Sequence, residues 1–152
     1  MGFFDFMTED IAIDLGTANT LIIHNGKVVV DSPSIVARDR VSGRIIATGN
    51  EANLMQGKTH ENIKTIRPLK DGVIADFQAS EEMIKEFVKK IPAFRKKFFP
   101  PSLRMVICIP SGITEVEKRA VQDSARHMNA KEIYLIYEPM AAAIGVGIDI
   151  ME

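Results

Sequence analysis

Apolar and polar residues follow a strand-like pattern at the start of the chain. Apolar runs cover residues 11–15, 20–24 and 27–30, and each run has a length typical of a strand. Residues 25–26 (Asn-Gly) join the second run to the third and favour the tight turn of a β-hairpin. We therefore expect an antiparallel meander that ends at residues 31–33 (Asp-Ser-Pro), because proline cannot donate a hydrogen bond inside a central strand.

The following stretch, residues 31–74, has the pattern of a small insertion. It contains a strand pair at 34–38 and 44–48, and Asn50 is expected to cap the short helix that follows. Residues 58–71 are polar and carry both signs of charge, which is typical of a solvated face. We interpret 31–74 as a small α+β subdomain inserted into the main fold.

The remainder of the chain predicts helices and strands in alternation. Ser80 is expected to cap an amphipathic helix over 81–91, and Pro92 is expected to end or kink that helix. Two β-branched-rich runs, at 103–109 and 132–137, are expected to be strands.

A helix is predicted between these last two strands. Thr114 and Glu117 have the spacing of a capping box at its start. A helix that joins two apolar strands implies a right-handed crossover and parallel pairing. The expected fold is therefore α/β and ribonuclease H-like: a mixed sheet with three antiparallel and then parallel strands, and helices on both faces. The expected buried stripe of the helix consists of Val116, Ala120, Val121, Ala125 and Met128.

Composition narrows the possible functions. The 152-residue chain is 46% hydrophobic and has a net charge of −1, so it lacks the basic field expected of a nucleic-acid-binding protein. Its single cysteine, Cys108, rules out an internal disulfide and suits a reducing cytoplasm. No apolar stretch is long enough to cross a bilayer.

The turn at residues 14–20 (Asp-Leu-Gly-Thr-Ala-Asn-Thr) carries more chemistry than a hairpin needs. Gly16 lets a ligand approach the backbone closely, and Thr17, Ala18 and Asn19 can present successive N–H groups to phosphate oxygens. Asp14 has the carboxylate that a hydrated Mg²⁺ prefers. From the residues alone, an ordinary polar loop remains an equal alternative.

Glu138 is the second carboxylate that is expected at a strand end. Ligands of open sheets bind outside the carboxyl ends of the strands, and Asp14 and Glu138 both follow apolar strands there. The alternative for Glu138 is a first-turn helix residue that interacts with the helix dipole.

Two aromatic segments suggest contact with a membrane. Residues 1–7 contain Phe3, Phe4, Phe6 and Met7 and have neither a signal-peptide nor a myristoylation pattern. Residues 94–101 interleave phenylalanines, including Phe98 and Phe99, with basic side chains that suit anionic headgroups. The alternative for residues 1–7 is that they fold back onto the core. For 94–101 the alternatives are a loop whose aromatics cover the sheet edge, or aromatics that stack on nucleic acid.

Four motifs in order resemble those of the MreB family of actin-like ATPases, and together they cover the whole chain. The first is the turn at 14–20, with its Thr-Ala-Asn-Thr ending. The others are residues 67–76 (Arg-Pro-Leu-Lys-Asp-Gly-Val-Ile-Ala-Asp), 109–117 (Ile-Pro-Ser-Gly-Ile-Thr-Glu-Val-Glu) and 137–145 (Tyr-Glu-Pro-Met-Ala-Ala-Ala-Ile-Gly).

The resemblance implies the first domain of the actin fold, with subdomain IA at 1–30 and 75–152 and subdomain IB at 31–74. It implies binding of ATP and Mg²⁺, with Glu138 orienting the attacking water. It also implies filaments on the inner face of the cytoplasmic membrane that position cell-wall synthesis, with partners in the elongation machinery. Membrane contact would fall to the residues at the two aromatic segments, Phe3, Phe4, Phe6, Met7, Phe98 and Phe99.

Length is the departure from the family pattern. Family members continue into a second phosphate loop and a second domain with the adenosine pocket, which this sequence does not contain. We therefore expect an N-terminal half without appreciable ATPase activity alone. Two alternatives remain on the same fold: a non-enzymatic membrane- or partner-binding module, and a metal-dependent nuclease that uses Asp14 and Glu138.

Overall fold

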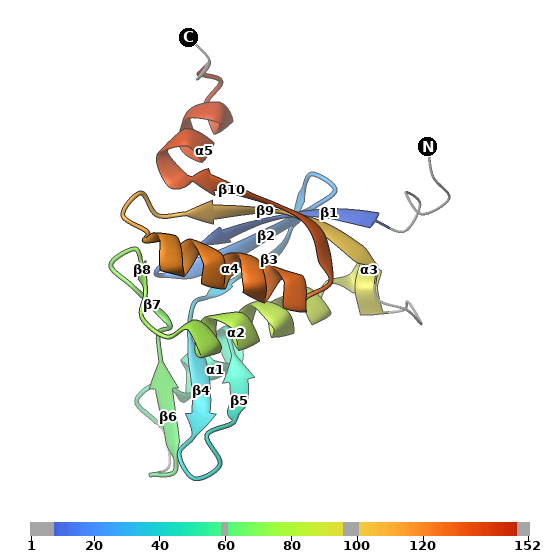
Figure 1. The fold of residues 1–152 in the computed structure, drawn as a ribbon. Helices are drawn as coiled ribbons and strands as arrows, with labels where there is room; N and C mark the ends of the chain where they lie inside the picture. The colour runs from blue at the N-terminus through green and yellow to red at the C-terminus, as the bar shows by residue number, and fades with distance from the viewer. Residues whose placement is uncertain (1–7, 59–60, 96–100, 149–152) are drawn as a thin grey trace.

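The computed structural model describes residues 8–58, 61–95 and 101–148 and contains a five-stranded mixed sheet in the order β10-β9-β1-β2-β3. β1 pairs antiparallel with β2 and parallel with β9, and β9 pairs parallel with β10. The expected meander and parallel crossover are therefore confirmed (Figure 1). The strands of this sheet are β1 (Thr8–Leu15), β2 (Asn19–His24), β3 (Lys27–Pro33), β9 (Ser102–Ile109) and β10 (Ala130–Tyr137).

The segment between β3 and the first long helix forms a separate group of strands. A three-stranded sheet has the order β5-β4-β6, and a two-stranded hairpin joins β7 to β8. Figure 1 shows the three-stranded sheet extending away from the large sheet. The division into subdomains IA and IB at residues 31–74 stays a prediction. The elements are β4 (Val36–Asp39), β5 (Ile45–Thr48), α1 (Asn50–Met55), β6 (Ile63–Ile66), β7 (Leu69–Lys70) and β8 (Val73–Ile74).

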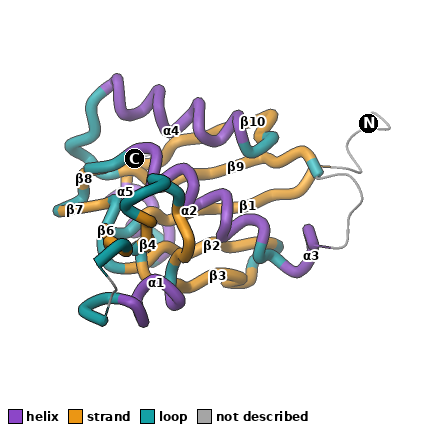
Figure 2. The backbone as a smooth tube through the Cα atoms, turned by 90° about the horizontal axis from the view of Figure 1, so that it is seen from below, coloured by secondary structure: helices purple, strands orange, loops and turns teal. Residues whose placement is uncertain are grey.

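Two helices, α2 (Phe77–Lys89) and α4 (Glu115–His127), lie side by side under the large sheet (Figures 1 and 2). A short helix, α3 (Pro92–Arg95), follows α2, so Pro92 begins a new helix after α2 has ended. The last helix, α5 (Glu138–Gly145), begins directly where β10 ends and contains no buried residue.

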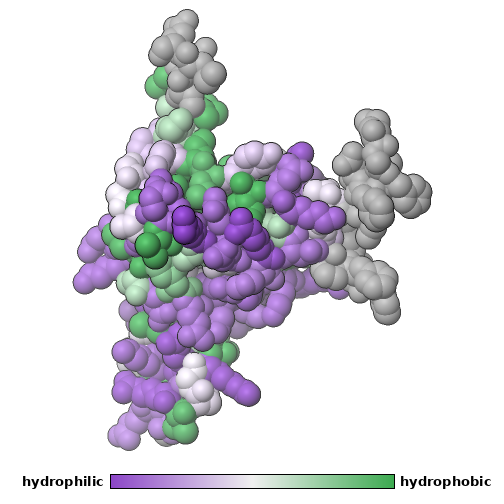
Figure 3. Space-filling view, viewed as in Figure 1, coloured by the Kyte–Doolittle hydropathy of each residue, from purple (hydrophilic) through white to green (hydrophobic). Residues whose placement is uncertain are grey.

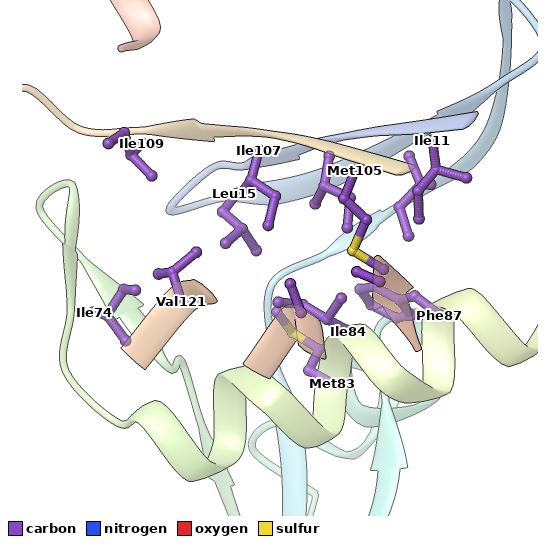
Figure 4. Close-up of a cluster of buried hydrophobic side chains, with 14 of the residues drawn as sticks. Ile11, Leu15, Ile74, Met83, Ile84, Phe87, Met105, Ile107, Ile109 and Val121 are labelled. Carbon is purple, nitrogen blue, oxygen red and sulfur yellow. The ribbon is translucent and has the colours of Figure 1, made fainter. Parts of the chain in front are cut away.

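The main core lies between the sheet and these two helices (Figure 4). Alternate residues of each central strand point into it, because successive side chains of a strand point to opposite faces. From the helix side, Met83 and Phe87 of α2 and Val121 of α4 meet them. The strand residues are Ile11, Ile13 and Leu15 of β1, and Met105, Ile107 and Ile109 of β9.

The outer face of the sheet also carries apolar side chains. Ile23, Ala12, Val106 and Tyr134 form one row across four strands, because each is a register partner of the next. Tyr134 is 54% exposed, and Ile23 and Val106 are each more than a third exposed. A shallow cavity of about 360 Å³ lies over this row. Figure 3 shows further hydrophobic side chains at the upper end of the molecule, around α5.

Two predicted helix caps are wrong by a few residues. Gly49, not Asn50, is the N-cap of α1, because the chain enters this helix with φ 62° and ψ −132°, a conformation that favours glycine. Asp76, not Ser80, caps α2: its side chain accepts a hydrogen bond of 2.9 Å from the Ala79 N–H. Ser80 is buried in the first turn, and its hydroxyl has no partner in the described part of the chain.

Three other expectations for secondary structure and burial need correction. β3 continues through residues 31–33 and ends at Pro33, which is tolerated because β3 is an edge strand of its sheet. Residues 58–71 are not only a solvated face, since they contain β6 and β7. Val116, in the first turn of α4, is 76% exposed, whereas Val121 and Ala125 are buried as expected.

We predict that Asp76→Ala lowers the free energy of unfolding by about 1 kcal/mol, because the first turn of α2 loses its capping acceptor. Asp76→Asn keeps a capping oxygen and should cost less. Ser80→Ala is the matched control, and we expect little change because its hydroxyl forms no cap. Urea unfolding followed by circular dichroism measures all three, and a larger loss for Ser80→Ala would contradict the assignment.

Candidate functional site

The candidate site is built around the turn between β1 and β2. Leu15 and Thr20 are the last register partners of the two strands, so residues 16–18 form the tip. Gly16 is required there for lack of space: a Cβ at this position would lie 2.4 Å from the Asn19 carbonyl oxygen. The turn therefore has a fixed shape that a side chain at Gly16 would disrupt.

Two backbone carbonyls of this turn, those of Gly16 and Ala18, accept hydrogen bonds from the buried residue Ser34. The Ser34 hydroxyl donates to the Gly16 oxygen at 2.6 Å, and the Ser34 N–H donates to the Ala18 oxygen at 2.8 Å. Arg67 Nη1 reaches the same Ala18 oxygen at 3.5 Å. In the part of the chain that the structure describes, the turn and loop hydrogen bonds include none donated by the N–H groups of Gly16, Thr17 or Ala18. At this turn the Gly16 and Ala18 carbonyls are thus occupied while backbone donors are available, an arrangement that suits an anion.

Side chains also tie the turn to neighbouring segments. The Thr17 hydroxyl accepts a hydrogen bond of 3.0 Å from the Gly72 N–H, in the turn between β7 and β8. The Asn19 amide donates to Asp31 of β3 at 3.0 Å. Residues from three separate parts of the chain therefore fix the turn.

Asp14 lies one residue before the end of β1 and is exposed on the outer face of the sheet. Its neighbours Ile13 and Leu15 are buried on the opposite face. No hydrogen bond or ion pair of the described residues uses the Asp14 carboxylate. A free carboxylate beside available backbone donors fits a hydrated Mg²⁺ that accompanies a phosphate group.

Glu138 is the first residue of α5 and follows β10 directly. Pro139 stabilises this helix start because its fixed φ suits the first turn. Glu138 is exposed, and the structure records no side-chain cap hydrogen bond at this helix start. The expectation that Glu138 stands at a strand end is confirmed.

Cys108 shows that the two carboxylates lie near one another. It is the register partner of Asp14 on one side and of Ile136, two residues before Glu138, on the other. The pKa of the Cys108 thiol is raised above its ordinary value by burial, and further by the negative charges of Asp14 and Glu138. Both acids therefore act on one thiol at the end of the central strands.

The structure brings together most of the residues that the sequence predicts for the site: Asp14, Gly16, Thr17, Ala18, Asn19 and Glu138. Their roles stay predictions. The proposed membrane residues Phe3, Phe4, Phe6, Met7, Phe98 and Phe99 lie outside the described residues.

Sequence reasoning missed Ser34, Arg67 and Gly72. Ser34 gave no signal, since it follows a segment that was expected only to end the meander. Gly72 had one: Asp71 and Gly72 form an Asp-Gly pair, both with positive φ, which is typical of a tight hairpin.

Within the described ranges, no group of three or more His, Cys, Asp or Glu side chains could hold a metal ion. None of the helices described for residues 8–148 is long and apolar enough to cross a bilayer.

The sheet order, the insertion after β3 and the helix after β10 define the first domain of an actin-like fold. Solved structures share this architecture. MreB5 of Spiroplasma citri bound to AMPPNP superposes with a TM-score of 0.80 at 36% identity, over 94% of this chain and 42% of that chain. The MamK double helical filament, at 20% identity and a TM-score of 0.73 over 91% of this chain and 43% of that one, shows the fold alone.

Sequence comparison identifies the particular family. The family described as MreB/Mbl protein matches residues 8–152, and the chain belongs to this family. It is 47% identical to the cell shape-determining protein MreB of Escherichia coli K12 over 95% of its length, and 49% identical to the cell shape-determining protein Mbl of Bacillus subtilis over the same share. The chain spans 43% of each of these relatives. These findings do not favour the nuclease or the non-enzymatic module.

The shared effect on Cys108 gives a test of the site. We predict that Asp14→Asn and Glu138→Gln each lower the pH midpoint of iodoacetamide alkylation of Cys108, because removing a nearby negative charge favours the thiolate. Cys108 is the only thiol in the sequence, so the reaction needs no other substitution.

Glu132→Gln is the matched control for this experiment. Glu132 is also an exposed carboxylate of β10, but it pairs in register with Arg104, near the opposite end of β9. We expect no change in the midpoint for this variant. Equal midpoints for all three variants and the unsubstituted chain would contradict the placement of Asp14 and Glu138 beside Cys108.

Proposed function

We propose that the chain is the nucleotide-binding N-terminal part of an actin-like cytoskeletal ATPase that determines cell shape. The observation that carries this proposal is the turn between β1 and β2. Its Gly16 and Ala18 carbonyls accept hydrogen bonds from the buried Ser34, and its backbone N–H groups are available beside the carboxylate of Asp14. Support comes from the relatives, which are cell shape-determining proteins, and from MreB5 structures with AMPPNP and ADP.

Each residue of the site has a distinct part in this proposal. The N–H groups of residues 16–19 would hold the β- and γ-phosphates, and Asp14 would hold a hydrated Mg²⁺. The metal supplies charge neutralisation to the phosphates when it is bound. Glu138 accepts a hydrogen bond from the attacking water and so orients it toward the γ-phosphate. Catalysis of this kind rests on positioning and electrostatics, which exposed, correctly placed carboxylates provide.

The described site offers only one side of a nucleotide cleft. One hairpin contacts the phosphates, and the purine would have no pocket of its own in the segment that the relatives share with this chain. Because that segment is 43% of the relatives' length, we propose that turnover requires groups from the remaining part.

We predict weak binding without hydrolysis for the 152-residue chain. Mg·ATP and Mg·tripolyphosphate should bind with a Kd on the order of 1 mM and should shift the backbone amide signals of residues 16–19 in NMR spectra. No phosphate release above the buffer rate is expected. Sustained ATP turnover by this chain would contradict the half-site interpretation.

A matched glycine pair tests the same site. Gly16→Ala should abolish the shifts, because the new Cβ collides with the Asn19 carbonyl. Gly145→Ala, at a position with open space around the added Cβ, should leave binding unchanged. Equal binding by both variants would overturn the assignment of the phosphate site to this turn.

We propose further that the protein lies in the cytoplasm, peripherally on the inner face of the membrane. The residues next to the two aromatic segments support a joint contact. Thr8 and Ser102 are register partners, and their hydroxyl oxygens lie 3.0 Å apart. Thr8 and Ser102 therefore lie together at the end of the sheet opposite the turn between β1 and β2. Self-association into filaments and contact with the cell-wall elongation machinery complete the proposal.

Vesicle binding tests the membrane contact. We predict that the chain co-sediments with vesicles containing anionic lipid, and that replacing Phe3, Phe4, Phe98 and Phe99 by Ser reduces the bound fraction several-fold, since each buried aromatic contributes about 1.5–3 kcal/mol. Val41→Ser is the control, because Val41 is 83% exposed in the turn between β4 and β5. Unchanged sedimentation of the fourfold variant would count against both anchors.

A further inference from the structure

Ser34 is a buried polar residue that neither the sequence motifs nor the proposed catalytic roles include. It lies between the end of β3 at Pro33 and the start of β4 at Val36, and it is 0% exposed. Buried hydroxyl groups are retained where they have hydrogen-bond partners. The recorded partners of Ser34 are the Gly16 and Ala18 carbonyls of the turn between β1 and β2 and the hydroxyl of Thr20, the second residue of β2.

The direction of these hydrogen bonds is fixed by chemistry. The Gly16 carbonyl oxygen, 2.6 Å from Ser34 Oγ, can only accept, so the Ser34 hydroxyl donates its single proton there. The Thr20 hydroxyl, 2.9 Å from the same Oγ and also fully buried, must then donate to Ser34. The result is a buried relay from Thr20 through Ser34 to Gly16.

This relay determines where the donors of the turn point. In a trans peptide group, the C=O and the following N–H point in opposite directions. The Gly16 carbonyl points toward Ser34, so the Thr17 N–H points away from it. The Ser34 N–H holds the Ala18 carbonyl at 2.8 Å, so the Asn19 N–H also points away from this buried side.

We infer that Ser34 is a positioning residue for phosphate recognition: it orients the N–H groups of Thr17 and Asn19 toward the bound oxyanion. This inference rests on the proposed function, and it attributes the orientation of these two N–H groups to the hydrogen bonds of Ser34. Without the Ser34 hydroxyl, the Gly16 peptide can rotate and present its carbonyl oxygen to the phosphate, which repels it.

Titration with Mg·tripolyphosphate tests the inference, with NMR signals of residues 16–19 as the readout. Ser34→Ala should weaken binding about tenfold, which corresponds to about 1.4 kcal/mol, and should shift the free-state amide signal of Thr17. Thr20→Val, which keeps a similar side-chain shape and replaces the hydroxyl that donates to Ser34 by a methyl group, should weaken binding about twofold to threefold.

Ser32→Ala is the matched control. Ser32 is also buried, at 9% exposed, but its hydroxyl makes none of the hydrogen bonds of the turn. We expect the tripolyphosphate affinity of the Ser32→Ala variant to equal that of the unsubstituted chain, even if the substitution lowers the free energy of unfolding. Equal affinities for Ser34→Ala, Thr20→Val and Ser32→Ala would overturn the positioning role of Ser34 but not the phosphate site. Absence of binding by the unsubstituted chain would instead overturn the phosphate site itself.

Discussion

Burial of alternate residues of β1 is the constraint on which the rest of the structure depends. Ile11, Ile13 and Leu15 face the helices, and this leaves Asp14 on the outer face of the sheet. β1 is also the central strand, paired with β2 and β9. The burial of these three residues therefore determines which face of the sheet packs on the helices, and it directs the Asp14 carboxylate to the opposite face.

In the turn after β1, the hydrogen bonds accepted by two backbone carbonyls decide which polar groups remain available to a ligand. A tight turn exposes both carbonyls and N–H groups, and only the N–H groups attract an anion. Here the Gly16 and Ala18 carbonyls accept hydrogen bonds from Ser34, which follows β3, and Arg67 also donates to the Ala18 carbonyl at 3.5 Å. In the proposed site, anion binding therefore depends on the contacts to the Gly16 and Ala18 carbonyls as much as on the residues of the turn itself.

The sequence was sufficient for features that depend on local patterns. Alternation located the strands of the large sheet, and the Thr114–Glu117 capping box is present as predicted, with both of its hydrogen bonds. Where several local signals compete, tertiary contacts decided. Ser80 and Asp76 are both good capping residues, but Ala79 and Ser80 are themselves buried within α2, and Asp76 forms the cap.

For the site, the carboxylates and the turn were predictable because each follows a strand. The support of the turn was not. Ser34 and Gly72 reach it only through folding, across 18 and 55 residues of chain. A single sequence contains no pattern for such contacts, and their polar atoms look ordinary until the partner is known.

The register of β9 has a consequence for insertions and deletions. β9 separates β1 from β10, and Cys108 is the point at which both neighbours align. Deleting one residue within β9, even an exposed one such as Val106, would turn every later side chain of the strand to the opposite face. Cys108 would then no longer align with both Asp14 and Ile136, although neither of these residues had changed. The length of this strand is therefore under tighter constraint than the identity of the residues on its outer face.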